Sequence, residues 1–226
     1  MSFFDSLQQQ TASSRDHVLE APVFEAVRQG RFDRDSYTWF LTQAYHHVKH
    51  TVPLMMACGG RLRQDQEWIR KALVHYIDDE YGHEQWILDD LAACGADRDA
   101  AMHSTPDRNI QLMVAWLYHQ IERGNPLAFF GMVHVLEGTS IAVATQTGQV
   151  VQKTLGLPKK AFSYLFSHGA LDLEHFEFFR TLMEKITDPE DQRAIVDSAD
   201  MVYHLYGNML HNIPLLAEGG KHHAVA

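Results

Sequence analysis

The sequence predicts an all-α protein that forms a single domain. Turn-forming residues divide the 226 residues into long segments, within which apolar residues recur three or four positions apart. The alternating apolar and polar pattern that is typical of strands is scarce. No long Ser/Pro/Gly-rich stretch indicates a linker. We therefore expect one helical domain over residues 1–216 and a flexible tail over residues 217–226.

Seven helical segments are expected, each bounded by residues that start or stop helices. In chain order they cover about residues 3–30, 35–58, 66–94, 107–123, 126–155, 158–186 and 189–216. Glycines follow the first four segments: Gly30, Gly59-Gly60, Gly95 and Gly124. Prolines stand at the beginning of the last three: Pro126, Pro158 and Pro189.

Composition and charge argue against several classes of protein. The formal net charge is −10, and no basic stripe is present to neutralise a phosphate backbone, so nucleic-acid binding is not expected. No apolar run approaches the roughly 20 residues that span a bilayer, and the N-terminus lacks a signal-peptide pattern. We expect a cytoplasmic protein with no membrane contact. Cys58 and Cys94 match no zinc or redox spacing, which indicates idle thiols.

Polar residues replace core positions on two of the apolar stripes. In the third segment, Glu80 and His83 continue a stripe formed by Ile69, Leu73, Tyr76, Ile87 and Leu91. They are one helical turn apart, so both side chains are expected to point inward. In the sixth segment, three consecutive stripe positions carry His168, Asp172 and His175. A solvated helix face would not interrupt an otherwise continuous apolar stripe in this way.

Glu137 lies in the most apolar segment, where apolar residues surround the helix axis on nearly every side. Burying several ionisable groups is costly unless they are paired or bind metal, and few Lys or Arg residues point inward to pair with them. Three imidazoles and three carboxylates suit iron or manganese better than calcium or structural zinc. Three carboxylates would offset most of the charge of two divalent ions, which favours a dinuclear site. Taken singly, each of these groups could instead be a hydrogen-bonded core or surface residue.

One Glu-x-x-His, a later Glu in an apolar helix and a final His-x-x-x-Asp-x-x-His together resemble the haem-oxygenase-like di-iron oxidases and oxygenases. TenA-type and PqqC-type proteins are related to them by fold. The segment from Gly30 to Asp33 and the following Tyr37 are similar to the entry of the second helix in this superfamily. The resemblance implies a seven-helix bundle that is frequently dimeric, and we expect a homodimer.

Carried over residue by residue, the resemblance implies six protein ligands: Glu80, His83, Glu137, His168, Asp172 and His175. We assign Glu137 and Asp172 a catalytic role as well. In the second segment, His46, His47 and His50 form a further cluster. His47 lies closest to the apolar face, so we select it as an extra ligand or as a support for the ligands. Packing or surface roles for these three histidines stay open.

The function that the resemblance implies is dioxygen-dependent oxidation of a small organic substrate. The cofactor would be two Fe(II) ions, with manganese possible, and O2 would be the co-substrate. The substrate would be amino-acid-like or fatty-acid-like, and the reaction N-oxygenation, desaturation or carbon–carbon cleavage. The protein would supply ligand geometry, water exclusion and substrate orientation.

Three alternatives are open at this stage. In a haem oxygenase, His17 would be the proximal ligand, although the flexible Gly-rich distal motif is replaced by Glu137-Gly138-Thr139-Ser140-Ile141-Ala142. A TenA-type thiaminase would need a nucleophilic cysteine in the pocket, and residues 120–160 contain none. A non-catalytic iron-binding bundle would hold metal without turning over a substrate.

Overall fold

In a computed structural model the chain forms helices joined by short turns, and residues 1–217 contain no strand. The structure describes these residues, apart from the side chains of residues 168–174. In this part of the chain the α-helices are α1 (Phe3–Gln10), α2 (Ala12–Leu19), α3 (Pro22–Arg28), α4 (Arg34–Val48), α5 (Thr51–Arg61), α6 (Glu67–Glu80), α7 (His83–Ala93), α8 (Arg98–His103), α9 (Arg108–Arg123), α10 (Phe129–Thr139), α11 (Thr145–Leu155), α12 (Ser163–Met183) and α13 (Pro189–His211). The predicted all-α class is confirmed. The predicted tail beyond residue 217 lies outside the described residues.

All seven expected segments are helical, but the first three are interrupted. Pro22 begins α3 and Pro53 lies in the first turn of α5. Proline has no backbone N–H, so the preceding helix cannot continue its hydrogen bonds through it. Gly82, with a φ of 89°, separates α6 from α7. The expectation that Gly59-Gly60 end a helix was wrong, because both lie inside α5.

The fifth expected segment, residues 126–155, is a continuous but irregular helical stretch. It begins with a 3-10 turn (Pro126–Ala128) and passes from α10 through a π-helical turn (Ser140–Ala144) into α11. By length and composition alone it could cross a membrane, yet 61% of its most apolar window is buried inside the fold. That degree of burial is typical of a core helix in a protein that does not span a membrane.

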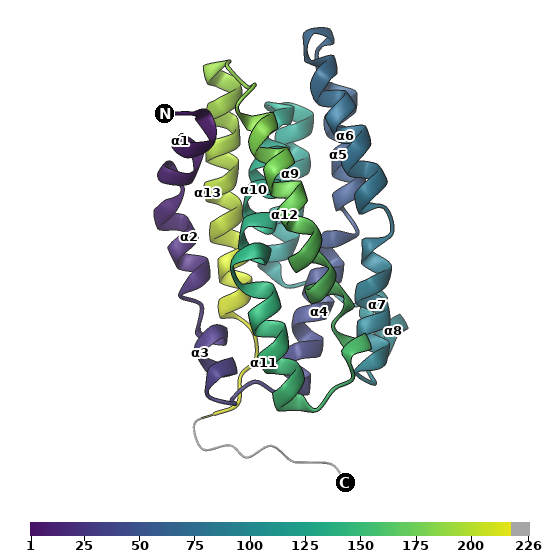
Figure 1. Ribbon diagram of the computed structural model, residues 1–226. Coiled ribbons are helices and arrows are strands. Elements are labelled where there is room, and N and C mark those ends of the chain that lie inside the picture. The colour runs from purple at the N-terminus through teal and green to yellow at the C-terminus, as the bar shows by residue number, and fades with distance from the viewer. Residues whose placement is uncertain (218–226) are drawn as a thin grey trace.

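Figure 1 shows the helices as a bundle, with α10 near its middle and α12 and α13 beside it. Helix α10 contacts α13, α12, α9 and α5. At Gly131 an added Cβ would lie 2.5 Å from the Ser198 Cβ atom and 2.6 Å from the Ala199 nitrogen. Glycine at this position therefore allows α10 and α13 to approach closely. The helix that carries Glu137 is thereby held in the core.

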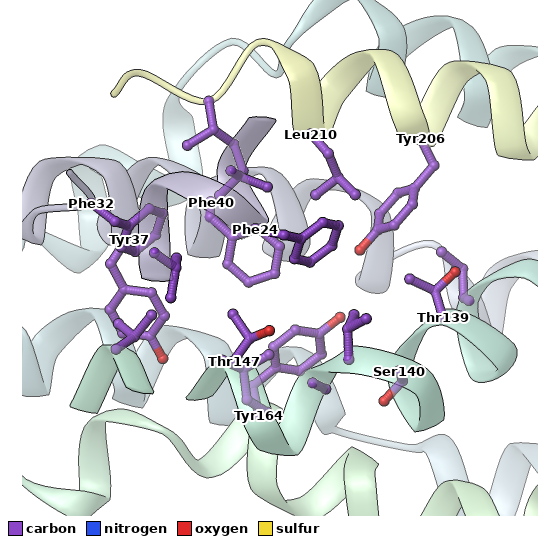
Figure 2. A pocket seen from close by; sticks show the side chains of 18 residues that line it. Phe24, Phe32, Tyr37, Phe40, Thr139, Ser140, Thr147, Tyr164, Tyr206 and Leu210 are labelled. Atoms are coloured by element: carbon purple, nitrogen blue, oxygen red, sulfur yellow. The ribbon is translucent and has the colours of Figure 1, made fainter. Parts of the chain in front are cut away.

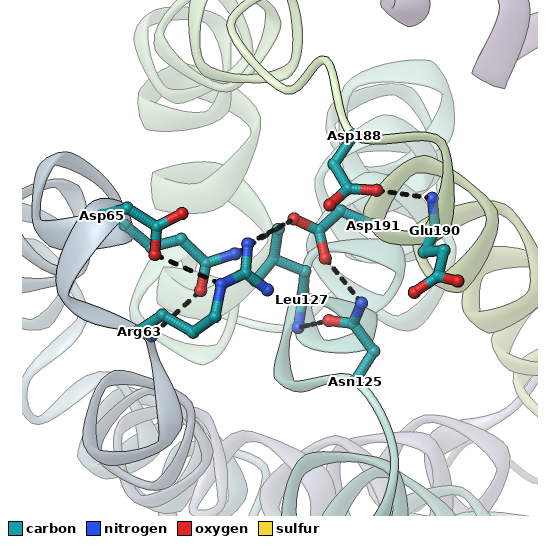
Figure 3. A network of polar contacts seen from close by, with 8 residues as sticks. Arg63, Asp65, Asn125, Leu127, Asp188, Glu190 and Asp191 are labelled. Atoms are coloured by element: carbon teal, nitrogen blue, oxygen red, sulfur yellow. Dashed lines mark hydrogen bonds and ion pairs between the residues drawn. The ribbon is translucent and has the colours of Figure 1, made fainter.

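A buried carboxylate joins three elements at one end of the bundle (Figure 3). Asp191, at the start of α13, is 5% exposed. It accepts hydrogen bonds from the side-chain amides of Asn125, at 2.6 Å, and Gln66, at 3.0 Å. The Arg63 Nη2 atom lies 3.8 Å from its Oδ2. These partners offset the cost of burying the charge, so we assign this network a structural role.

Candidate metal centre

Glu80 and His83 meet across the break between α6 and α7. Glu80 is the last residue of α6, and His83 is the first residue of α7. The His83 Nδ1 atom lies 2.9 Å from the Glu80 Oε2 atom. Only 3% of His83 is exposed, and its ring stacks on Trp86 with the centroids 3.9 Å apart. The predicted pair is therefore present. Its two members do not lie on one continuous helix, because the chain turns at Gly82 between them.

His175 brings α12 to the same carboxylate. Its Nδ1 atom lies 3.7 Å from the Glu80 Oε1 atom, so two imidazoles flank Glu80. Its Nε2 atom lies 3.5 Å from the Asp79 Oδ2 atom. Asp79 was not among the predicted site residues. The run Asp78-Asp79-Glu80 was its only signal in the sequence, and an exposed acidic cluster would look the same.

Glu137 and His47 share a cavity with Glu80. This cavity has a volume of about 70 Å³, and its lining includes all three residues. Glu137 is half-buried, and its Oε2 atom is fully buried. His47, on α4, is 3% exposed and packs edge-on against Tyr206. Glu80 thus contacts two imidazoles and also lines the cavity beside Glu137.

The other two histidines of this cluster, His46 on α4 and His50 just before α5, have partners elsewhere. The His46 Nε2 atom lies 2.8 Å from the Ser104 hydroxyl, and its Nδ1 lies 3.2 Å from the Lys49 ammonium. Burial, helped by the nearby charge of Lys49, lowers the pKa of His46 to about 4. The His50 Nδ1 atom lies 3.2 Å from the Tyr118 hydroxyl. Of the three, His47 is the one that lines the cavity.

The side chains of His168 and Asp172 lie outside the described part of the structure. Among the described side chains, no three His, Cys, Asp or Glu residues gather as they would around one ion. The donors that are described nevertheless fit iron in kind. They are two carboxylates and two imidazoles, drawn from α6, α7, α10 and α12.

A second, apolar cavity of about 90 Å³ adjoins the first (Figure 2). The two share Leu136, Ser140 and Tyr164 as lining residues. The remaining lining residues are Val23, Phe24, Val27, Phe32, Tyr37, Phe40, Thr139, Val143, Ala144, Thr147, Val151, Leu165, Tyr206, Leu210 and Ile213. None of the lining residues carries a formal charge. The cavity can therefore receive an apolar molecule beside Glu80 and Glu137.

Tyr164, between the two cavities, is held in place by the start of its helix. The buried Asp90 carboxylate accepts hydrogen bonds from the backbone N–H groups of Ser163 and Tyr164, both at 2.8 Å. This caps the N-terminus of α12. Burial raises the pKa of Asp90. Tyr206 lines the apolar cavity from α13, and burial raises its pKa to about 12. The Tyr206 hydroxyl therefore stays protonated at neutral pH.

A sequence model of a family described as iron-containing redox enzymes matches residues 38–207. The chain belongs to this family. The match includes Glu80, His83, Glu137 and His175. The predicted family is confirmed, and the ligand set stays a prediction. A search of curated protein sequences found no match.

This member of the iron-containing redox enzyme family has the haem-oxygenase-like fold that was predicted. A domain with such a fold from Shewanella denitrificans superposes with a TM-score of 0.84 at 21% identity, covering 94% of this chain and 92% of that chain. A TenA homologue from Pseudomonas syringae pv. tomato gives 0.77 at 13% identity, covering 93% and 92%. Haem oxygenase-2 from Synechocystis, in complex with haem and NO, gives 0.71 at 14% identity, covering 94% and 85%.

In this member of the family, His17 faces α13. Its Nε2 atom lies 3.0 Å from the Asn208 Oδ1 atom, and its ring stacks on His211 with the centroids 4.6 Å apart. At Gly207 an added Cβ would lie 2.6 Å from the His17 ring. His17 does not line either of the two cavities described above. This packing does not favour His17 as a haem ligand.

The two cysteines are buried thiols, and neither of them lines either cavity. Burial raises the pKa of Cys58 to about 12 and the pKa of Cys94 to about 11. The Cys58 thiol donates to the Pro126 carbonyl oxygen at 3.3 Å. Thiols that stay protonated at neutral pH are poor nucleophiles, which agrees with the prediction that they have no chemical role.

Proposed function

We propose that the chain is a non-haem di-iron oxidase or oxygenase that uses dioxygen to oxidise a small organic substrate. One observation carries the proposal. The Glu80 side chain, which is 11% exposed, is flanked by His83 and His175, and it lines the same cavity as Glu137. Burying such a group is costly unless its members pair with one another or hold metal, and carboxylates and imidazoles together are donors that suit iron.

The residues proposed to hold the two iron ions are Glu80, His83, Glu137, His168, Asp172 and His175. Their imidazole and carboxylate donors suit iron, and manganese could bind to the same donors. When bound, ferrous iron supplies the electrons that activate dioxygen. His47, on the cavity wall, is proposed to support the site or to add a ligand.

The protein's own side chains would orient the donors and keep water out. Asp79, 3.5 Å from the Nε2 atom of His175, would hold that ring with its Nδ1 atom toward Glu80. Carboxylates commonly orient metal-binding imidazoles from outside in this way. Leu136, Met132 and Val133 give the cavity apolar walls on the α10 side. Such walls limit the access of water to a reaction there.

The apolar cavity favours a substrate with an apolar body. Its lining carries no charge, and its polar groups are hydroxyls, including those of Ser140, Tyr164 and Tyr206 (Figure 2). A zwitterionic amino acid would lose hydration in the cavity without gaining an ionic partner. We therefore favour a fatty-acid-like substrate whose apolar chain lies in this cavity and whose carboxylate would meet the positive charge of the iron that Glu80 and Glu137 are proposed to hold. Desaturation or carbon–carbon cleavage would then be the reaction.

Oxygen uptake tests this proposal. Protein loaded anaerobically with ferrous iron is mixed with oxygen and either a medium-chain carboxylate or an amino acid, and the products are identified by mass spectrometry. We expect uptake to be stimulated by the carboxylate and abolished in Glu137→Ala. The proposal would be contradicted if iron is bound but neither substrate class is altered, because a non-catalytic iron-binding bundle would behave in that way.

Haem titration separates the proposal from the haem-oxygenase alternative. A histidine-bound haem gives an intense Soret band, which His17→Ala would abolish. We expect no such band in the wild-type protein, because His17 is packed against α13. A Soret band that depends on His17 would overturn the non-haem assignment.

A further inference from the structure

The apolar cavity beside the candidate metal centre is long and narrow. Its volume is about 90 Å³, whereas an apolar cavity of about 150 Å³ holds one benzene molecule. Its lining on the α10–α11 side nevertheless reaches from Ser140 through Ala144 and Thr147 to Val151. At about 1.5 Å of helical rise per residue, this wall is about 15 Å long. So small a volume along so long a wall leaves room for an extended chain, but not for a ring.

Two helices show which end of this cavity adjoins the metal centre. Leu136 and Ser140 line both cavities, so the α10 end of the wall is the end beside the proposed iron ligands. Helix α4 also lines both: Tyr37 lines the apolar cavity, and His47 lines the cavity of the metal centre. The helical rise places these two residues about 15 Å apart. Tyr37 and Val151 therefore lie at the end of the apolar cavity that is remote from the metal centre.

Phe32 and Tyr37 form the wall at this remote end, which Figure 2 shows opposite Ser140. Phe32 is 4% exposed and Tyr37 is 1% exposed. The Tyr37 hydroxyl donates to the Ala161 carbonyl oxygen at 2.8 Å, and its ring stacks on Phe162 with the centroids 4.8 Å apart. The Tyr37 ring cannot move aside without breaking these contacts. The remote wall is therefore fixed in position.

We propose that this cavity sets the length of the substrate, because it takes an unbranched alkyl chain whose terminal methyl group stops against Phe32 and Tyr37. The inference rests on the proposed function, in which the carboxylate of the substrate meets the iron. An extended hydrocarbon chain advances by roughly 1.3 Å per carbon, because its bonds of about 1.5 Å follow a zigzag. A wall about 15 Å long therefore accommodates roughly twelve carbons.

Anaerobic calorimetric titration of the ferrous protein with hexanoate, dodecanoate and hexadecanoate tests this length limit. Without oxygen the acids bind but are not oxidised. Each buried methylene group should tighten binding by roughly fourfold, so dodecanoate should bind far more tightly than hexanoate. Hexadecanoate should bind no more tightly than dodecanoate, because its last carbons find no room. An isomer of dodecanoate with a methyl branch at mid-chain should bind at least roughly tenfold more weakly than dodecanoate.

Two substitutions should move the length limit in opposite directions. Thr147→Phe fills the cavity about 10 Å from Ser140. It should weaken dodecanoate binding by at least roughly tenfold and leave hexanoate binding unchanged. Phe32→Ala removes part of the remote wall and should let hexadecanoate bind several-fold more tightly than it binds the wild-type protein. Gln149→Phe is the matched control for Thr147→Phe, because Gln149 is an exposed residue of the same helix, and it should bind all three acids as the wild-type protein does.

The outcomes separate this inference from the proposed function. Circular dichroism verifies that each variant is folded, and if Phe32→Ala does not fold, Thr147→Phe decides. The length limit is overturned if Thr147→Phe binds dodecanoate as tightly as the wild-type protein, if wild-type affinity still rises from dodecanoate to hexadecanoate, or if the branched isomer binds as tightly as dodecanoate. If the limit is observed but dodecanoate stimulates no oxygen uptake, only the proposed oxidation fails. If none of the acids binds, both fail.

Discussion

His175 lies between two acidic residues, and this arrangement gives each ring nitrogen a separate role. Nδ1 faces Glu80 at 3.7 Å, and Nε2 faces Asp79 at 3.5 Å. Asp79 also lies 3.5 Å from His75, one turn earlier on α6. A carboxylate on the outer nitrogen of a metal-binding imidazole fixes the ring and makes it a stronger donor. Asp79 is therefore expected to act on the iron through His175.

Removing the charge of Asp79 should weaken iron binding without unfolding the protein. We expect Asp79→Asn to raise the dissociation constant for ferrous iron by roughly 10- to 100-fold, because the outer partner of His175 is weakened. The constant is measured anaerobically, in competition with a chelator. Asp78→Asn removes the same charge from an exposed neighbouring position and should leave the affinity unchanged. Equal losses in the two variants would indicate a general charge effect and contradict a role for Asp79.

At the residue scale, the sequence predicted which side chains point inward. The apolar stripe placed Glu80 and His83 on one inward face, and the two side chains do meet. Asp79 could not be predicted, because its neighbour Asp78 is exposed and the two look alike in the sequence. The burial of His134 agrees with its apolar surroundings in the sequence. Its proximity to Arg15 could not be foreseen, because it depends on how α2 packs against the rest of the bundle.

At the scale of the elements, the stripes located the helices better than they located the breaks. A spacing of three and four residues persists across Tyr81-Gly82, so the third segment resembled one helix until the left-handed φ of Gly82 was known. Pro22 and Pro53 are signals in the sequence for the breaks that precede them. The π-helical turn Ser140–Ala144 has no such signal, because it contains no proline or glycine.

The contact between α10 and α13 should tolerate no side chain at Gly131. A Cβ there would lie 2.5–2.6 Å from atoms of α13, two of which belong to its backbone. We expect Gly131→Ala to lower the free energy of unfolding by about 1–3 kcal/mol through overpacking. Denaturant titration measures this loss.

Gly138 on the same helix provides the matched control for Gly131. An added Cβ at Gly138 meets no atom within 4 Å. Gly138→Ala should therefore be neutral or stabilise the protein by roughly 0.5–1 kcal/mol, because alanine favours the helix. If both variants were destabilised equally, the close approach of α10 and α13 would not be the cause.

Across the whole molecule, acid should destabilise the fold through its buried histidines. The pKa of His134 is lowered from 6.5 to about 4 by burial and by Arg15. Below pH 6.5 His134 is therefore protonated in the unfolded chain, whereas in the folded protein it stays neutral until about pH 4. The free energy of unfolding therefore decreases as the pH is lowered through this window. For this residue the decrease is about 2 kcal/mol between pH 7 and pH 5.

Denaturant titration at pH 7 and pH 5 measures this loss in the wild-type protein and in His134→Phe. The variant has no imidazole at residue 134, so its stability should change less between the two pH values. The difference between the two proteins isolates His134 from Asp90, whose pKa burial raises and which acts with the opposite sign. An identical pH dependence in both proteins would show that His134 is not buried as a neutral group.

The all-α class and the contact between Glu80 and His83 were predictable, because both depend on periodic burial. The two cavities were not, because their walls combine residues from distant helices. Tyr206 of α13 and Tyr164 of α12, for example, face one cavity from opposite sides (Figure 2). Such contacts depend on tertiary packing, which periodicity along a single helix does not describe.

Metal analysis after anaerobic loading with ferrous iron tests the central claim most directly. We expect roughly two irons to be retained per chain, as in other carboxylate-bridged bundle sites. Glu80→Ala should retain one or none, because Glu80 both contacts the two imidazoles and lines the cavity beside Glu137. Asp78→Asn should retain the wild-type amount. Wild-type protein that retains no iron, or a folded Glu80→Ala variant that retains two, would contradict the account.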